Sequence, residues 1–176
     1  MKHFIRLLVL TVSAGLFSVS ALADDVKIGV LDWQQLSNKA PQAIEAGKRL
    51  EKEFQGPNEK LIAKQKEFQA KRDKLQRDKD VMSVAERGKK EKELAKMEQD
   101  LRRMDEELRS DYTTRHREEM DDFVKTVREA VEKLAQEEKL DVVLPQEATV
   151  YVSDRIDITD KVMNILEKAK SNKKPS

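Results

Sequence analysis

The stretch that decides the fold is LAKMEQDLRRMDEEL, residues 94–108. Its apolar side chains recur at spacings of three and four residues, at Leu94, Met97, Leu101, Met104 and Leu108. On a helix this spacing produces one narrow apolar stripe surrounded by charged residues, which is typical of a coiled-coil seam. The stretch is therefore predicted to pack lengthwise against another helix.

A partner helix is predicted upstream. Phe54, Leu61, Phe68 and Leu75 recur every seven residues, which gives a second narrow stripe. Gly56-Pro57 interrupts this helix and should bend it, because proline removes a backbone hydrogen bond and clashes with the preceding turn.

The two helices are predicted to form an antiparallel hairpin over residues 43–139 that turns near 80–83. Ser83 and Glu86 have the S-x-x-E spacing of a capping box, which restarts a helix there. The arms should span about 58 Å and about 84 Å at 1.5 Å per residue. A single stripe per arm buries little surface, so the hairpin is expected to be flexible.

Charge dominates the stretch from Pro41 to Lys139, in which 25 acidic and 25 basic side chains occur among 99 residues. This number of charges cannot be buried in a compact core, because an unpaired buried charge is costly. The stretch must therefore project into water. Between Lys60 and Arg117 there are 18 basic and 13 acidic residues, whereas 118–139 has four and eight. This uneven distribution of charge suggests that the distal part of the hairpin steers negatively charged polymers or surfaces toward the arms. The alternative is that the charges only keep the helices solvated and that their asymmetry arose by chance.

The segments on either side of the hairpin, 24–42 and 140–170, are predicted to form a small β-rich body. Alternating apolar residues predict strands at 26–31, 140–144 and 148–152, Asp32 and Gln35 cap a short helix, and a last helix opens at 157–160. These elements are too few for an independent core, so other copies of the chain should complete it. The residues expected in this trimerisation body are Val26, Ile28, Val30, Val142, Leu144, Val150 and Val152. The predicted class is α+β, mainly α, with a frayed tail at 171–176.

The first 23 residues resemble a secretory signal peptide. Lys2 and Arg6 precede the apolar run 7–19, and Ala21-Leu22-Ala23 is an A-x-A cleavage site. Cleavage after Ala23 would leave 33 basic and 34 acidic side chains. This balance argues against a nucleic-acid-binding protein, because such proteins usually carry a clear excess of basic residues.

Catalytic motifs are missing from the sequence. It has no cysteine, no Gly-rich phosphate loop, no H-E-x-x-H and no nucleophile elbow. His116 is the only histidine outside the leader and lies between two arginines. We therefore expect no enzyme activity, no cofactor and no metal site.

Taken together, these segments resemble the Skp (OmpH) family of periplasmic chaperones. The resemblance rests on the strand 27–32, on Leu50-Glu51-Lys52-Glu53-Phe54 at the start of the hairpin, and on the segments 140–144, 150–151 and 157–160. It implies a homotrimer with three helical tentacles around a cavity. It also implies a periplasmic holdase that binds unfolded outer-membrane β-barrel proteins without ATP and delivers them for membrane insertion.

The resemblance further implies a lipopolysaccharide-binding patch on the second arm. In the family this patch combines a lysine with a pair of arginines further along the second arm. Arg115 and Arg117 are the best matches to the two arginines, while the position of the lysine falls near Asp105. The arginines considered for contact with lipopolysaccharide, an anionic membrane surface or a client are Arg102, Arg103, Arg109, Arg115 and Arg117. Two alternative functions remain open: a structural coiled-coil spacer or assembly factor of the envelope, and a lipopolysaccharide-binding protein.

Overall fold

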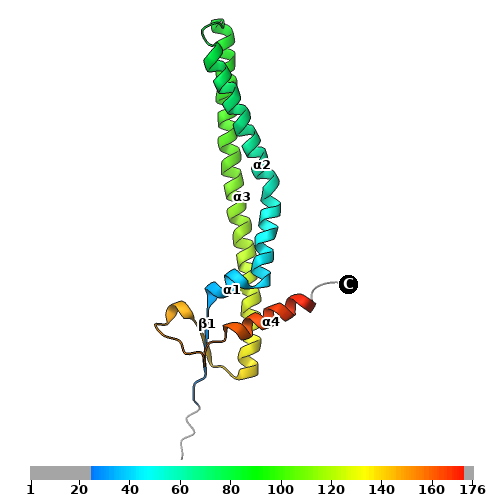
Figure 1. The fold of residues 1–176 in the computed structure, drawn as a ribbon, viewed down its shortest axis with the longest axis vertical. Helices are drawn as coiled ribbons and strands as arrows, with labels where there is room; N and C mark the ends of the chain where they lie inside the picture. Colours follow the sequence, from blue (N-terminus) through cyan, green and yellow to red (C-terminus); the bar gives the residue numbers. More distant parts are fainter. Residues whose placement is uncertain (1–24, 173–176) are drawn as a thin grey trace, which may run out of the picture.

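The computed structural model describes residues 25–172 as a small body with one long projection (Figure 1). The elements in chain order are β1 (Ile28–Leu31), α1 (Trp33–Lys39), α2 (Pro41–Asp78), α3 (Val84–Glu138), β2 (Val142–Pro145), the 3-10 helix η1 (Gln146–Ala148) and α4 (Thr159–Asn172). The predicted class, α+β and mainly α, is confirmed. The predicted signal peptide, residues 1–23, lies outside the described residues.

The projection is an antiparallel pair formed by α2 and α3 (Figure 1). At 1.5 Å per residue, the 38 residues of α2 and the 55 of α3 span about 57 Å and about 83 Å. α2 passes through Pro57 without ending, and its axis changes direction between its cyan base and its green end in Figure 1. This is the bend that an internal proline produces.

The chain turns between Asp78 and Val84. The Ser83 hydroxyl accepts a hydrogen bond from the Glu86 N–H, and the Glu86 carboxylate accepts one from the Ser83 N–H at 3.1 Å. The predicted capping box is thus present, and it fixes where α3 begins.

The sheet of the body joins the segments that precede and follow the hairpin. β1 and β2 are parallel, with Ile28 opposite Val142 and Val30 opposite Leu144, and Val30 also forms a bridge with Asp157. Gly29 allows the close packing here, because a Cβ at this position would lie 3.1 Å from the side chains of both Ile158 and Leu140.

The core of the body also includes the end of α3. The ring of Trp33 in α1 packs at a tilt against the ring of Phe123, with centroids 5.4 Å apart. The buried members of this core are Leu31, Leu36, Ala40, Phe123, Val127, Ala130, Leu134, Ile158, Val162 and Leu166. Residues 123–134 therefore pack in the body, although they fall within the range 43–139 that was predicted for the hairpin.

Three sequence predictions about the body need correction. The strand predicted at 148–152 is wrong, because η1 covers 146–148 and no strand follows in that segment. An alternating pattern forms a strand only where it pairs with a neighbouring strand, and in the described residues the segment 148–152 pairs with neither strand of the sheet. The strands at 26–31 and 140–144 are instead 28–31 and 142–145, and α4 continues to Asn172, into the predicted tail.

Candidate functional site

An ion cluster ties the two arms together where the hairpin leaves the body. The Arg49 Nε of α2 donates to the Glu119 Oε1 of α3 at 3.0 Å, and an Nη of Arg49 donates to the second carboxylate oxygen. Arg115 donates to the same Oε1 at 3.4 Å. Glu119 is only 7% exposed, and the hydrogen bonds from Arg49 hold the pKa of its carboxyl below the ordinary value. A buried charge is tolerated here because two cations share it.

An apolar groove runs along the hairpin beside this cluster. It consists of two adjoining cavities of 360 and 680 Å³ that share Glu51, Phe54 and Tyr112. The Phe54 and Tyr112 rings meet edge to face, with centroids 5.2 Å apart. Tyr112 and Met120 remain partly exposed in the groove, so their apolar surface is available to a ligand.

The seam of the hairpin is thin along its whole length. Among its nine predicted members Leu61 is buried, while the others are half-buried: Phe54, Phe68, Leu75, Leu94, Met97, Leu101, Met104 and Leu108. Towards the tip, the ion pair that joins the arms is Lys71 with Glu93 at 2.6 Å, and both side chains are exposed. Exposed pairs contribute little to stability, so the arms are held mainly by one stripe of half-buried contacts.

Four of the five candidate arginines are occupied by carboxylates of the same chain. Arg102 contacts Glu98 at 2.5 Å, and Arg109 contacts Asp105 at 2.9 Å. Arg103 lies 3.0 Å from Asp100 and 3.8 Å from Glu107. Arg115 pairs with Glu53, Glu118 and Glu119. Within the described residues, Arg117 alone of the five forms no ion pair.

Large apolar side chains are exposed on the body. Val26 and Tyr151 are largely exposed and Val150 is fully exposed, while Ile28, Val142 and Leu144 are exposed to a lesser degree. The other two residues expected in the trimerisation body are less exposed. Val30 is 2% exposed and already covered by its own chain, and Val152 is half-buried.

Among residues 25–172, no group of side chains is suited to hold a metal ion, and none of the helices combines the length and the apolar character that spanning a bilayer requires. His116 lies in the groove, 6.0 Å from Tyr112 between ring centroids.

Sequence reasoning missed the cluster of Arg49 and Glu119. A signal for it was present, because Glu119 lies four residues before the core residue Phe123 and therefore on the same face of α3. A carboxylate on an apolar stripe requires a cationic partner on the facing helix, and Arg49 supplies it.

Comparison with known proteins agrees with this architecture. The family model described as Outer membrane protein (OmpH-like) matches residues 27–166. A chain from Pectobacterium atrosepticum named Chaperone protein Skp is 34% identical over 83% of this chain and 88% of its own. A chain of the same name from Yersinia enterocolitica is 28% identical over 83% of this chain and 89% of its own.

A solved structure shares the fold. It is a crystal structure from Caulobacter crescentus described as an outer membrane chaperone (OmpH-like), with a TM-score of 0.73 and 14% identity over 82% of this chain and 86% of the other. At that identity the likeness concerns the fold alone. The match to the family model, together with the first of these relatives, shows that the chain belongs to the OmpH-like outer membrane protein family.

Proposed function

We propose that this protein is a holdase chaperone that binds unfolded outer-membrane β-barrel proteins and prevents their aggregation without ATP. The observation that carries the proposal is the 34% identity to a protein named Chaperone protein Skp over 83% of this chain. The family name links the chain to outer membrane proteins. The architecture supports the proposal, because a long polar projection on a small base can surround a client.

The thin seam supports a gripping role for the hairpin. Half-buried contacts such as those of Phe68 and Leu75 hold the arms together weakly, so the arms can bend to fit clients of different size. The groove at Phe54 and Tyr112 provides apolar contact surface near the root. Many weak contacts of this kind suit a partner without fixed structure.

We further propose that three copies assemble through the body formed by residues 24–42 and 140–170. A single chain leaves Val26, Val150 and Tyr151 in water, and large apolar side chains exposed on a small body favour self-association. Three hairpins would then enclose a cavity for the client. The mass of the mature protein in solution tests the trimer, and a monomer at micromolar concentration would contradict both the trimer and the cavity.

Export to the periplasm is part of the proposal. The leader at 1–23 would be removed after Ala23, so the protein isolated from a periplasmic extract should begin at Asp24. The proposed role needs no catalytic group, cofactor or metal. N-terminal sequencing tests the cleavage site, and an intact leader would contradict it.

Aggregation of a client is the direct test of the function. An unfolded outer-membrane β-barrel protein is diluted from urea into buffer without nucleotide, and light scattering is followed. Scattering should be suppressed at about one trimer per client. Unchanged scattering with trimer in excess would overturn the proposal. The double variant V150D/Y151D serves as the comparison, because charges at the body surface should prevent assembly and reduce suppression.

The two alternatives have less support. A stiff spacer requires a continuous, well-packed seam, whereas the seam here is half-buried. Lipopolysaccharide binding at Arg115 and Arg117 remains a prediction, and Arg115 would first have to leave three carboxylates. The double variant R115A/R117A tests it, since unchanged binding would remove both residues from the site.

A further inference from the structure

The sulfur atoms of this chain gather on the hairpin. The sequence contains no cysteine and six methionines. Beyond the first residue, four of the remaining five lie in the region 43–139: Met82, Met97, Met104 and Met120. Met97 and Met104 belong to the seam, so their thioethers, which are open to oxidation, lie where the two arms meet.

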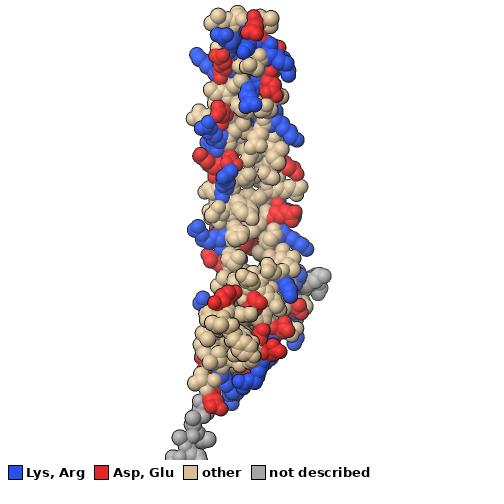
Figure 2. Space-filling view, turned by 60° about the vertical axis from the view of Figure 1, so that its left-hand side comes forward, with Lys and Arg blue, Asp and Glu red and all other residues tan. Residues whose placement is uncertain are grey.

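A small reagent can reach the seam at these two residues. Both side chains are half-buried rather than enclosed. On the face shown in Figure 2, uncharged atoms cover the middle of the projection, and most Lys, Arg, Asp and Glu atoms lie along its sides. Methionine is a common target of oxidants, and a half-buried thioether beside water is within their reach.

Contacts between the arms set the register of the hairpin. Four of them are Arg49 with Glu119, Glu53 with Arg115, Phe54 with Tyr112, and Lys71 with Glu93. Because the arms are antiparallel, a residue further along α2 lies level with a residue earlier in α3. This register places Met97 level with Phe68. It places Met104 level with Leu61, which is 5% exposed and is the one buried residue among those predicted for the seam.

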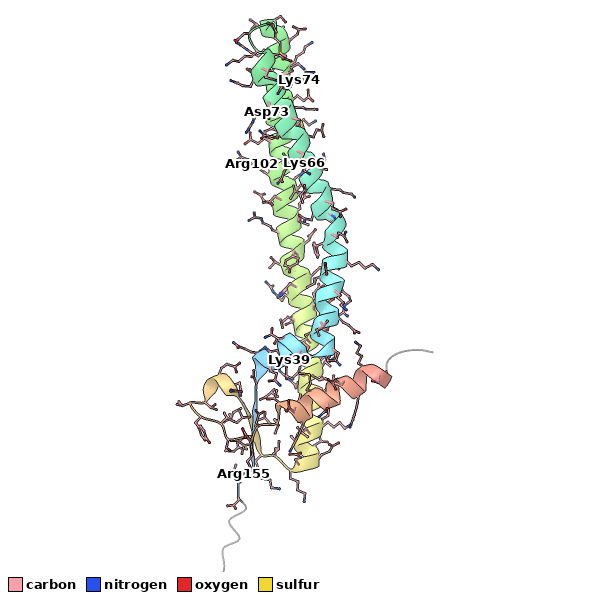
Figure 3. The ribbon with its side chains drawn as sticks, viewed as in Figure 1. Lys39, Lys66, Asp73, Lys74, Arg102 and Arg155 are labelled. Atoms are coloured by element: carbon pink, nitrogen blue, oxygen red, sulfur yellow. The ribbon has the colours of Figure 1, made fainter. Side chains whose placement is uncertain are left out.

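Charged side chains beside the two methionines do not tie the arms together. In Figure 3, Lys66 of α2 and Arg102 of α3 lie at the same height on the projection, as the register requires. Both side chains are exposed, and Arg102 pairs with Glu98 of its own helix. At this level the arms therefore depend on the apolar seam.

We propose that Met97 and Met104 form a reversible oxidation site, and that their oxidation opens the distal part of the hairpin. The oxidant is a two-electron oxidant such as hypochlorous acid. The thioether sulfur gives up two electrons and gains one oxygen atom, while chlorine is reduced to chloride and a proton is released. The product is methionine sulfoxide, which methionine sulfoxide reductases return to the thioether.

Oxidation opens the seam because it places a polar group among apolar side chains. The sulfoxide oxygen at Met104 lies level with buried Leu61, where a polar group without a hydrogen-bond partner is costly. At Met97 a polar sulfoxide replaces a thioether level with the ring of Phe68, although a thioether is the better neighbour for an aromatic ring. A seam that is half-buried from the start has little other contact to offset these losses.

The opening is confined to the part of the hairpin beyond the ion cluster. Nearer the body, the arms are joined by Arg49 and Glu119, whose contact does not involve a thioether. Toward the tip, the pair of Lys71 and Glu93 is exposed and holds the arms only weakly. The body should therefore stay intact while the distal arms separate.

The opened seam also changes the hold on a client, and this step rests on the holdase function proposed above. Separation of the arms exposes Phe68 and Leu61, and an unfolded client gains by covering such apolar surface. The oxidised protein should therefore suppress aggregation at a ratio of trimer to client about twofold lower than the untreated protein.

Mass spectrometry of peptides tests the modification on the full mature protein. The folded protein is treated with a small excess of hypochlorous acid, and the gain of one oxygen atom is measured at each methionine. Met97 and Met104 should be converted in the folded protein, and methionine sulfoxide reductases A and B together should restore them. Conversion only after unfolding in urea would overturn the proposal.

Amide hydrogen exchange tests the opening. In the oxidised wild type, exchange across residues 61–75 and 94–108 should accelerate at least about fivefold, while exchange in the body stays unchanged. The variant M97Q/M104Q carries polar side chains of similar length and should show the same acceleration without oxidant. Unaltered exchange in the fully oxidised wild type would contradict the opening.

The matched control is M97L/M104L. Leucine is close to methionine in volume and in helix propensity but has no sulfur. This variant keeps Met82, Met120 and Met163, so hypochlorous acid should change its exchange by less than about twofold. M82Q, in the turn between α2 and α3, should leave exchange in the arms unchanged. Equal acceleration by the oxidant in wild type and M97L/M104L would overturn the assignment to these two residues.

Client aggregation separates this proposal from the holdase function. If the untreated protein does not suppress aggregation, the holdase function is wrong, and hydrogen exchange still decides whether oxidation opens the arms. If the untreated protein suppresses aggregation and the oxidised protein does so no better, the holdase function stands and its regulation by oxidation is overturned.

Discussion

Arg49 and Glu119 join the two arms of the hairpin through a two-pronged contact in which Arg49 Nε lies 3.0 Å from Glu119 Oε1. The two partners differ in environment, because the Glu119 side chain is buried while the Arg49 side chain is more than half exposed. Loss of one partner therefore does not have the same consequence as loss of the other.

Arg49→Met is expected to lower the free energy of unfolding by about 2 kcal/mol, because Glu119 stays buried with only Arg115 nearby. Glu119→Gln should cost about 1 kcal/mol, since the freed Arg49 side chain can be hydrated. Urea unfolding followed by far-UV circular dichroism measures both. Arg102→Met, which removes an exposed pair, should cost about 0.5 kcal/mol or less. Equal costs at Arg49 and Glu119 would contradict this asymmetry.

Acid should weaken the fold through Glu119. Hydrogen bonding from Arg49 lowers the pKa of folded Glu119 below its ordinary value of 4.5. As pH falls below about 4.5, the unfolded chain therefore binds this proton first, and stability decreases until pH reaches the folded pKa. Above about 4.5 the contribution of the pair is fully present.

The test is the slope of unfolding free energy against pH. Glu119→Gln should make the slope below pH 4.5 shallower than in wild type. Arg49→Met, which removes the hydrogen bonds that lower the pKa of Glu119, should also make the slope shallower. Identical slopes for wild type and Glu119→Gln would rule out this linkage.

The capping box should control opening of the tip. Ser83→Ala removes the acceptor for the Glu86 N–H, which typically costs about 1 kcal/mol. Because helix ends open locally, amide hydrogen exchange near Glu86 should accelerate about fivefold while the body is unaffected. Ser110→Ala, at an exposed position inside α3, should leave exchange at the tip unchanged. Faster exchange throughout the chain would point to global destabilisation instead.

Two glycines should respond to alanine in opposite directions. Gly29→Ala places a Cβ about 3.1 Å from Ile158 and Leu140, and such overpacking should cost about 1–2 kcal/mol. Gly88→Ala meets nothing within 4 Å and should stabilise α3 by about 0.5–1 kcal/mol. Thermal unfolding of both variants gives the comparison. A stabilising Gly29→Ala would contradict the close packing at β1.

The hairpin was predictable because its signals are local. Heptad spacing at Phe54 and Leu61 depends only on neighbours along one helix, and the Ser83 cap depends on four consecutive residues. The residues of the body were harder to place. Helical periodicity shows that Phe123 faces a partner but not which one, so its packing against Trp33 was missed.

Contacts between residues far apart in sequence also explain why the strand prediction at 148–152 was wrong and why the partners of the candidate arginines were missed. Alternation over 148–152 fits a strand, but whether an edge is free to pair depends on the whole fold. Most partners of the candidate arginines lie at helical spacing, yet a sequence contains many such pairs, and Glu53 lies on the other arm of the hairpin. Only coordinates show that Arg115 is shared among Glu53, Glu118 and Glu119.

The pairing of β1 with β2 has a consequence for the order of folding. The register joins Ile28 to Val142, so the body cannot close until almost the entire chain is present. The hairpin contacts lie closer in sequence, and contacts of low sequence separation form sooner. If the chain becomes available for folding from its N-terminus onward, the two arms of the hairpin would therefore form first. Its apolar body surface would form last, after the arms that are to hold a client are already in place.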